Sequence, residues 1–456
     1  MRVAESSAKR KISRRSVRKD QIAEKRGVRR GATISGWRMI AAALIAAAGL
    51  WYWAVAIYAP GNAVQVQISG RPTGNNSDLY ARWYGTRELL VRGRDPYSME
   101  ITREIQMGFY GRPLDPKNKN DPKQQEGFAY PLYVAFLMAP LAQLPFPVAQ
   151  EISRWLLLLA IAVSVPLWSS AVGTRISVAA LVAAMVLAVG SYPAVMEFYQ
   201  QNLAALIVFL LAAAAACLAR GWLIVAGFLL ALATVKPEIS GLIIACLLCW
   251  SLCRIRERGR LVLSFVISLA VLIFCTELYL PHWPTHFLEA LRAYAATETD
   301  PSILQAIFTG WVALVVSVGL LVAVVFRAWR TRTSKAGSEQ FGWTLALVSS
   351  CTVVLIPKIA AYNQLVLIPA LLLLVAKWDG RRSFGLLARS AVKATFTCQL
   401  WQWAAAVVLA TASWLVPMHI VQRAAGFPLA TLLAIPVVTA LAVLLLTFMS
   451  SNTNRL

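Results

Sequence analysis

A polar interval at residues 61–127 separates the first two apolar segments of this chain and contains the run DLYARWYGTRELLVRGRDPY, residues 78–97. Most of the surrounding sequence is apolar enough to lie in a membrane, whereas this interval mixes acids, arginines and tyrosines. It is followed at once by Phe128-Ala129-Tyr130-Pro131. A channel or a passive scaffold has little use for such a loop. The interval therefore favours an enzyme that works at a membrane surface.

Composition supports a membrane protein. Apolar residues make up 58% of the chain and charged residues only 14%, which is unlike a soluble protein with a large core. Because a spanning helix needs about 20 apolar residues, we expect an all-α polytopic protein with about 11–13 transmembrane or re-entrant helices. The apolar segments lie at 37–59, 128–146, 150–171, 176–196, 203–219, 222–235, 237–253, 261–280, 303–326, 341–356, 363–376, 394–415 and 428–449.

The net charge of +23 raises the question of nucleic-acid binding, but its distribution argues against it. Basic residues gather in the N-terminal tail and at 254–260, 327–335 and 377–393. Clusters of this kind mark cytoplasmic flanks of membrane helices, and a basic tail sits readily on anionic lipid. We expect a disordered cytoplasmic tail at 1–36, a transmembrane domain at 37–450 with its catalytic external loop at 60–127, and a cytoplasmic C-terminus at 451–456.

The topology follows from the same charges. The first apolar run is too long for the core of a cleaved signal peptide, so it reads as an anchor in the plasma (inner) membrane with the N-terminus inside. If the first loop is external and the basic residues at 254–260 are cytoplasmic, an odd number of spans must separate them. The number of apolar segments between them is even, so one of these segments does not cross the membrane. A shallow or re-entrant helix at 128–146 satisfies this, and a single span over 222–253 satisfies it equally. The first choice places residues 197–202 and Lys236 on the outer side with Asp78.

Four polar places at the membrane edge are candidates for function, because ionisable residues there are costly. They are Asp78 with Arg82, spaced i, i+4; the run 197–202, EFYQQN; Lys236-Pro237-Glu238; and Pro357-Lys358 followed by Tyr362-Asn363-Gln364. A carboxylate among cations suits transfer of a sugar. The carboxylate deprotonates an acceptor hydroxyl, and the cations stabilise a phosphate leaving group. Two plainer readings stand beside this one. In the first, Asp78 is only a helix N-cap after Asn75-Asn76-Ser77. In the second, Lys236 extends along apolar surface so that its ammonium reaches the membrane interface.

Several motifs, taken in order, resemble glycosyltransferase family 87. Asp78-Leu79-Tyr80 followed by Gly93-Arg94-Asp95-Pro96-Tyr97 looks like the family's first external loop. The segment 128–132, with Ala139-Pro140-Leu141, resembles its tyrosine-proline segment before a membrane helix. Gln201-Asn202 resembles its glutamine–x–asparagine step. The stretch from Ala226-Gly227 to Lys236-Pro237 resembles its glycine-leucine-rich helix ending in lysine-proline. Each motif alone is weak, but they occur in register over most of the chain.

The resemblance implies a GT-C type fold and an inverting transfer of a hexose, often mannose, from a polyprenyl-phosphate donor, with no metal or other cofactor. The family's catalytic aspartate maps onto Asp78. We expect a lipid or glycan acceptor on the external face. The candidate site residues are Asp78 as general base; Lys236, Arg82 and Lys358 for the donor phosphate; and Tyr80, Tyr97, Tyr130, Glu197, Gln201, Asn202, Tyr362 and Asn363 for substrate. The stretch Pro113–Gln125 has no counterpart that we can match, and Tyr362-Asn363 fits the family only loosely.

Other readings of the sequence remain open. His282 and His286 are spaced for zinc but lack a third ligand at a useful spacing, so interface histidines are the better interpretation. A secondary transporter would usually show an internal repeat, and none is visible. A surface-glycan enzyme that uses a lipid-diphosphate donor would be expected to carry a long late external loop, whereas the late loops here are short. A membrane scaffold would leave the outer polar residues unexplained.

Overall fold

The computed structural model of the protein describes residues 36–68, 77–115, 117–122, 126–297, 300–308, 310–378 and 384–449. The expected basic tail, up to residue 35, and the C-terminal segment 451–456 lie outside these residues. Within them, all regular secondary structure is helical. The elements are α2 Gly36–Tyr52, η1 Trp53–Tyr58, α3 Ala59–Ile68, α4 Leu79–Arg92, α5 Met99–Tyr110, α6 Val134–Ala142, α7 Phe146–Ala171, α8 Val178–Val189, α9 Tyr192–Gln200, α10 Ala204–Ala219, α11 Leu223–Ala233, α12 Pro237–Leu252, α13 Ile255–Tyr279, α14 Trp283–Thr297, α15 Ile303–Ile307, α16 Gly310–Arg330, α17 Glu339–Leu355, η2 Ala361–Leu367, α18 Ile368–Ala376, α19 Leu386–Ala412, α20 Met418–Arg423, η4 Phe427–Leu429 and α21 Ala434–Met449.

Five helical stretches in the described part of the chain are long and apolar enough to cross a membrane, and a sixth is possible if α8 and α9, bent by 48°, form one broken span. Shorter apolar helices are α10, α11, α12 and the η2–α18 pair. The apolar side chains of α13 are largely exposed, as expected for a helix that faces lipid: Phe274 is 64% and Leu278 70% accessible. The protein is therefore an all-α polytopic membrane protein, as the composition predicts.

Several expected segments are shorter or more broken than a regular span. The segment 128–146 contains α6, whose nine residues are too few to cross a membrane and suit the expected re-entrant helix. The segment 222–253 is two helices, α11 and α12, separated by the turn 234–236. Pro237 is the first residue of α12, where its missing N–H costs no hydrogen bond. That turn places Lys236 at a helix junction.

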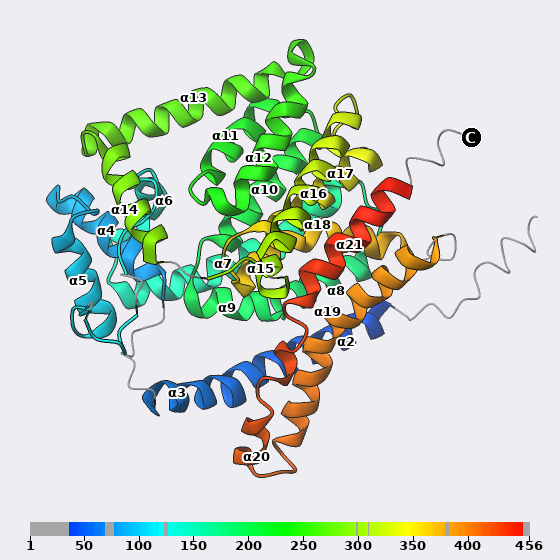
Figure 1. The fold of residues 1–456 in the computed structure, drawn as a ribbon, viewed down its shortest axis with the longest axis horizontal. Helices are drawn as coiled ribbons and strands as arrows, with labels where there is room; N and C mark the ends of the chain where they lie inside the picture. Colours follow the sequence, from blue (N-terminus) through cyan, green and yellow to red (C-terminus); the bar gives the residue numbers. More distant parts are fainter. Residues whose placement is uncertain are drawn as a thin grey trace, which may run out of the picture.

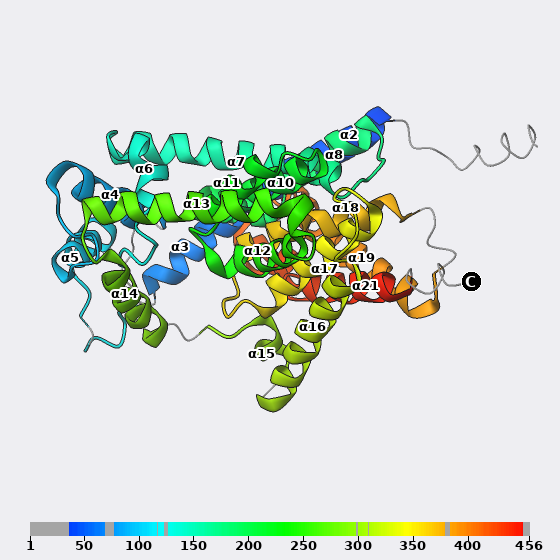
Figure 2. The same cartoon turned by 90° about the horizontal axis from the view of Figure 1, so that it is seen from above.

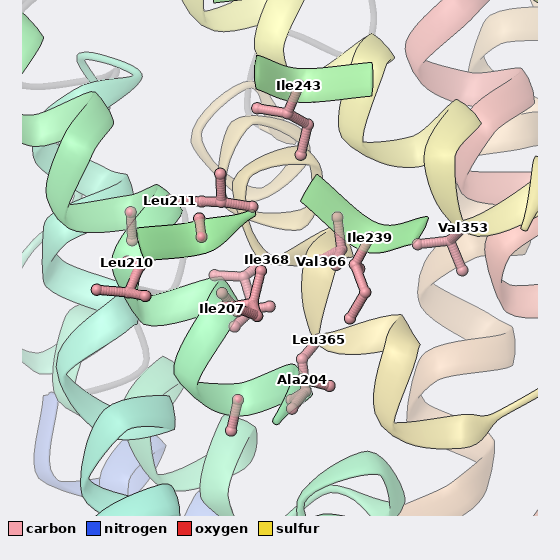
Figure 3. Packing of buried hydrophobic residues seen from close by; sticks show 14 of the residues in the cluster. Ala204, Ile207, Leu210, Leu211, Ile239, Ile243, Val353, Leu365, Val366 and Ile368 are labelled. Carbon is pink, nitrogen blue, oxygen red and sulfur yellow. The ribbon is translucent and has the colours of Figure 1, made fainter. Parts of the chain in front are cut away.

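Helix α10 lies at the centre of the molecule. Its surface is apolar on all sides, eleven of its sixteen residues are buried and none is fully exposed, as expected for a helix surrounded by other helices. Figure 3 shows Ile207 and Leu211 of α10 close to Ile239 and Ile243 of α12, with Val366 of η2 beside them. Asn202 lies two residues before α10, and Lys236 immediately precedes α12. Contacts between Asn202 and Lys236, and between Lys236 and Tyr362 of η2, bring these junctions together.

The elements of the long polar interval gather at one end of the molecule. Figures 1 and 2 show α4, α5, α6 and α14 together at the left. Gly93 ends α4 with a left-handed φ of 63°, and Ser98 caps α5 by accepting a hydrogen bond from the Ile101 N–H. Glu88, itself 2% exposed, binds Arg92 at 2.9 Å and Arg94 at 2.8 Å. These contacts fix the turn between α4 and α5.

The basic segment 253–260, which includes the start of α13, and the turn 331–338 lie against one another. Arg258 is buried, and its Nη1 donates to the carbonyl oxygens of Trp250 at 3.0 Å and Arg332 at 2.9 Å. Its Nη2 donates to Ser334 O at 2.9 Å, and the guanidinium lies 3.7 Å from the centre of the Trp250 ring. One arginine thus joins the turn between α12 and α13 to the turn between α16 and α17.

Candidate active site

Asp78 stands immediately before α4, in the N-cap position, but its side chain makes no capping hydrogen bond. Its backbone N–H donates to Gln200 O at 2.8 Å, which ties the start of α4 to the end of α9. The carboxylate oxygen Oδ2 accepts a hydrogen bond of 2.6 Å from Nδ2 of Asn202. The interpretation of Asp78 as a simple helix cap is therefore wrong. One carboxylate oxygen is held by an amide, and the residue stays partly accessible.

Asn202 also binds Lys236, so its amide connects a carboxylate with an ammonium group. Its Oδ1 accepts a hydrogen bond from Lys236 Nζ and another from the Ala204 N–H at 3.2 Å. An amide with Oδ1 on donors and Nδ2 on a carboxylate has all its polar atoms assigned, which fixes its orientation. The Asp78–Asn202–Lys236 group, which we call the acid–amide–lysine group, joins α4, the α9–α10 junction and the α11–α12 junction.

Lys236 is only 4% exposed. Its Nζ lies 4.8 Å from the centre of the Tyr362 ring and 3.7 Å from Glu238 Oε1. A snorkelling lysine would extend to the membrane surface, so that interpretation is wrong. Tyr362 belongs to η2, and its ring forms one wall around the lysine. The structure thus brings together Asp78, Asn202, Lys236 and Tyr362, four of the predicted residues.

Arg82 lies one turn after Asp78 and is completely buried. Its Nη1 donates to Tyr130 Oη at 2.7 Å and its Nη2 to the carbonyl oxygen of Gln201. The guanidinium also lies 4.9 Å from the centre of the Tyr130 ring. Tyr97 donates from its hydroxyl to Tyr130 O at 2.6 Å. Arg82, Tyr97 and Tyr130 thus hold the α4 loop against the segment before α6.

Gln201 holds the backbone of the junction in an uncommon conformation, with φ at 45°. Its Oε1 accepts hydrogen bonds from Ser77 Oγ at 2.5 Å and Gln150 Nε2 at 3.1 Å. Glu197 is fully buried, and its Oε1 accepts from the Ala205 N–H at 3.1 Å. The other oxygen of Glu197 has no hydrogen-bond partner within the described residues. These two residues shape the turn that presents Asn202.

The remaining predicted residues differ in how close they lie to the acid–amide–lysine group. Lys358 donates to Tyr294 Oη of α14 at 2.9 Å, so it joins the loop after α17 to α14. Asn363 is 3% exposed, and its Oδ1 has no partner in the described part of the chain. Tyr80 packs among aromatic rings, with centroid distances of 4.9 Å to Phe146 and 5.9 Å to Tyr84. None of its described contacts is with the acid–amide–lysine group.

Sequence reasoning did not single out two features of this site. Glu126 lies just before Phe128, hydrogen-bonds Tyr110 at the end of α5, and interacts electrostatically with Asp78. Burial and the Asp78 charge raise the pKa of the Glu126 carboxyl to about 7. The second feature is the pairing of His286 with Asp95: Nδ1 of the histidine lies 2.9 Å from Asp95 Oδ2, which links α14 to the turn after α4. An acid beside a motif was the available signal for Glu126, whereas nothing in the sequence pairs residues 95 and 286.

The residues described here contain no group of three or more histidine, cysteine or acidic side chains placed to hold a metal ion. The ionisable groups of the site are three acids and three cations: Asp78, Glu126 and Glu197, and Arg82, Lys236 and Lys358. Such a set can accept a proton at a carboxylate and bind an anion at a lysine.

Comparison with known proteins identifies the family. The sequence model of glycosyltransferase family 87 matches residues 128–357, just over half of the chain. The chain belongs to glycosyltransferase family 87. This confirms the resemblance and makes the protein a membrane glycosyltransferase. The matched range includes Tyr130, Glu197, Asn202 and Lys236, whereas Asp78 precedes it. No curated protein and no solved structure gives a significant match.

Proposed function

We propose that this protein transfers a hexose, with mannose the first candidate, from a polyprenyl-phosphate donor to a lipid or glycan acceptor on the outer face of the membrane. The observation that carries the proposal is the acid–amide–lysine group. It presents a carboxylate and a buried ammonium on the two ends of one amide side chain. Membership of a glycosyltransferase family supplies the reaction class.

Asp78 is the general base in this proposal. Within the described residues, Asp78 Oδ1 has no hydrogen-bond partner, while Oδ2 is held by Asn202. The acceptor hydroxyl gives its proton to Asp78 as its oxygen attacks the anomeric carbon. The bond from that carbon to the phosphate oxygen breaks, and the polyprenyl phosphate leaves with the electron pair. A single displacement of this kind inverts the anomeric configuration.

Lys236 stabilises the leaving group. An ammonium carries three N–H donors, and one described hydrogen bond of Lys236 goes to Asn202. The remaining donors are available to a phosphate oxygen, which gains charge as the glycosidic bond breaks. A monophosphate leaving group needs no metal bridge in this scheme. Lys358, at the late loop, is the second cation proposed for the phosphate.

An outer location fits the distribution of charge. The basic turns at 253–260 and 331–338 are joined to one another by Arg258. The helices α4, α5 and α14 gather at the other end of α13 (Figure 1). Under the positive-inside rule the basic turns face the cytoplasm. The acid–amide–lysine group then faces the external or periplasmic side.

The test uses the purified full-length protein in lipid nanodiscs, with a lipid extract from cells that lack the protein as the acceptor source. Polyprenyl-phosphate mannose, polyprenyl-phosphate glucose, a polyprenyl-diphosphate sugar and GDP-mannose are supplied separately. We expect an acceptor that gains one hexose with a polyprenyl-phosphate sugar alone. Transfer from the diphosphate or nucleotide donor would contradict the proposal, as would movement of substrate across the membrane without covalent transfer.

A further inference from the structure

The outward face of α16 carries an apolar groove. Figure 2 shows α15 and α16 projecting from one edge of the molecule. Val324 and Arg327 are buried on one side of α16. The other side is hollowed by a shallow groove of about 460 Å³, lined by six exposed apolar side chains that share one face of the helix: Val318, Leu321, Val322, Val325, Phe326 and Trp329. The groove is therefore a surface on which an apolar chain can lie.

Two arginines lie at one end of this groove, each over a ring that lines it. The guanidinium carbon of Arg330 lies 5.5 Å from the centre of the Phe326 ring. That of Arg332 lies 4.2 Å from the centre of the Trp329 ring. Arg332 Nη1 also donates to Trp329 O at 2.8 Å, which holds this guanidinium at the end of the helix. The apolar groove and the two cations therefore form one continuous surface.

Neither arginine forms an ion pair within the residues that the structure describes. The next acid along the chain, Glu339, pairs instead with Lys377 at 2.6 Å. The start of α13 differs, because Arg254 there pairs with Glu257 at 3.2 Å. The end of α16 therefore keeps a positive charge that no acidic side chain compensates, and such a surface attracts an anion.

We propose that this surface binds one anionic phospholipid, with an acyl chain in the groove of α16 and the headgroup phosphate on Arg330 and Arg332. Guanidinium groups bind phosphate oxygens through paired N–H donors. Two cations without acidic partners favour a headgroup with a net negative charge over a zwitterionic one. The positive-inside rule assigns this end of α16 to the cytoplasmic side, where anionic phospholipids gather. The site is separate in sequence from the basic tail, and it does not depend on the proposed sugar transfer.

The experiment is native mass spectrometry of the full-length protein, delipidated in a neutral detergent and titrated with dioleoyl phosphatidylglycerol or dioleoyl phosphatidylcholine. The wild-type protein should bind phosphatidylglycerol more tightly than phosphatidylcholine. Arg330→Gln and Arg332→Gln should each weaken phosphatidylglycerol binding at this site about fivefold, and the double variant about 30-fold, because each basic residue contributes to the attraction of an anionic lipid. The double variant should therefore retain one phosphatidylglycerol fewer. Val322→Trp, which fills the groove at an exposed position, should also weaken binding.

Arg254→Gln is the matched control, because it removes one exposed arginine that already has an acidic partner. It should leave lipid binding unchanged. Equal affinity of the wild-type protein for the two phospholipids would overturn the inference, and so would undiminished phosphatidylglycerol binding in the double variant. Unaltered binding in Val322→Trp would overturn the place given to the acyl chain. A wild-type dimer that Val322→Trp converts to a monomer would show that a second copy covers α16, which would also overturn the inference. Melting temperatures measured on the same preparations check that each variant is folded.

Discussion

Lys236 and Arg258 are both buried cations beside the ends of apolar helices, and their surroundings differ. Arg258 donates to the carbonyl oxygens of Trp250, Arg332 and Ser334 and stacks on an indole ring. Lys236 has one described hydrogen bond, to Asn202, and an ion pair of 3.7 Å to Glu238. A guanidinium bound by several carbonyls joins two turns, whereas an ammonium with donors to spare can bind a ligand anion. Burial alone does not separate a structural cation from a functional one.

Two aspartates of the polar interval at residues 61–127, Asp78 and Asp121, differ in the same way. Asp121 accepts hydrogen bonds from Arg112, the Asp115 N–H and Asn118 Nδ2, so both its oxygens are used within the loop. The Arg112 hydrogen bonds are the largest cause that lowers the pKa of Asp121, to about 2. Asp78 has one oxygen held by Asn202. Both oxygens of Asp121 are thus hydrogen-bonded within the loop, whereas Asp78 has only Oδ2 bound by Asn202.

The largest expected effect is that of Asp78→Asn. The substitution keeps the shape and the contact region of the side chain but removes the base. Turnover should fall about 100-fold or more, the usual contribution of a general base. Donor affinity should stay close to that of the wild-type protein. Asp121→Asn is the matched comparison, because it alters a carboxylate of the same loop that the mechanism leaves out. An equal loss of turnover per folded molecule in both variants would remove the distinction between the two aspartates.

Lys236→Ala should mainly weaken donor binding. The loss of a hydrogen bond to a charged group is worth about 1.5–3 kcal/mol, or about 10–150-fold in the dissociation constant. Titration of the purified variant with polyprenyl-phosphate mannose, followed by tryptophan fluorescence, measures it. An unchanged dissociation constant would leave Lys236 as a structural cation like Arg258.

Arg258→Gln should leave transfer per folded molecule and donor affinity unchanged. It removes the hydrogen bonds that join two turns far from the acid–amide–lysine group. The melting temperature should fall by a few degrees, as expected for a loss on the order of 1–3 kcal/mol. Thermal unfolding in nanodiscs and the donor titration measure the two quantities. A weakened donor affinity with normal stability would contradict the structural role assigned to Arg258.

Excess EDTA should leave transfer unchanged, which is the smallest effect expected. In the proposed reaction Lys236 and Lys358 meet the charge of a monophosphate leaving group, so no divalent cation takes part. The measurement is the transfer rate before and after chelation, with magnesium and manganese added back separately. A loss in EDTA that manganese restores would indicate a diphosphate donor.

Much of this arrangement was predictable from the sequence, because polar residues between apolar segments are costly and therefore informative. Asp78, Asn202 and Lys236 were all singled out in this way. The bridging role of Asn202 was not, since it depends on how the start of α4 and the junctions before α10 and α12 come together in space. Glu126 was not singled out, because its electrostatic interaction with Asp78 arises from the fold and not from a sequence motif.

The helix count was harder to predict than the site. Hydropathy marks apolar segments but not where they bend or stop. The segments that include α6 and α8–α9 proved to be a nine-residue helix and a pair bent by 48°. Both lie beside polar junctions that carry site residues, where the backbone must leave the regular helix. Tertiary packing at these junctions decides the breaks, and a single sequence does not display it.

The central claim is that Asp78, Asn202 and Lys236 form one active site, and Asn202→Ala tests it most directly. Turnover and donor affinity are measured on the same nanodisc preparation, and both are corrected for the folded fraction. We predict that both fall, because the amide orients the base through Nδ2 and the lysine through Oδ1. Gln402→Ala, which removes a buried amide on α19 that accepts from the Tyr192 N–H at 3.0 Å, is the matched control and should change neither quantity. Wild-type turnover and donor affinity in Asn202→Ala would contradict the account.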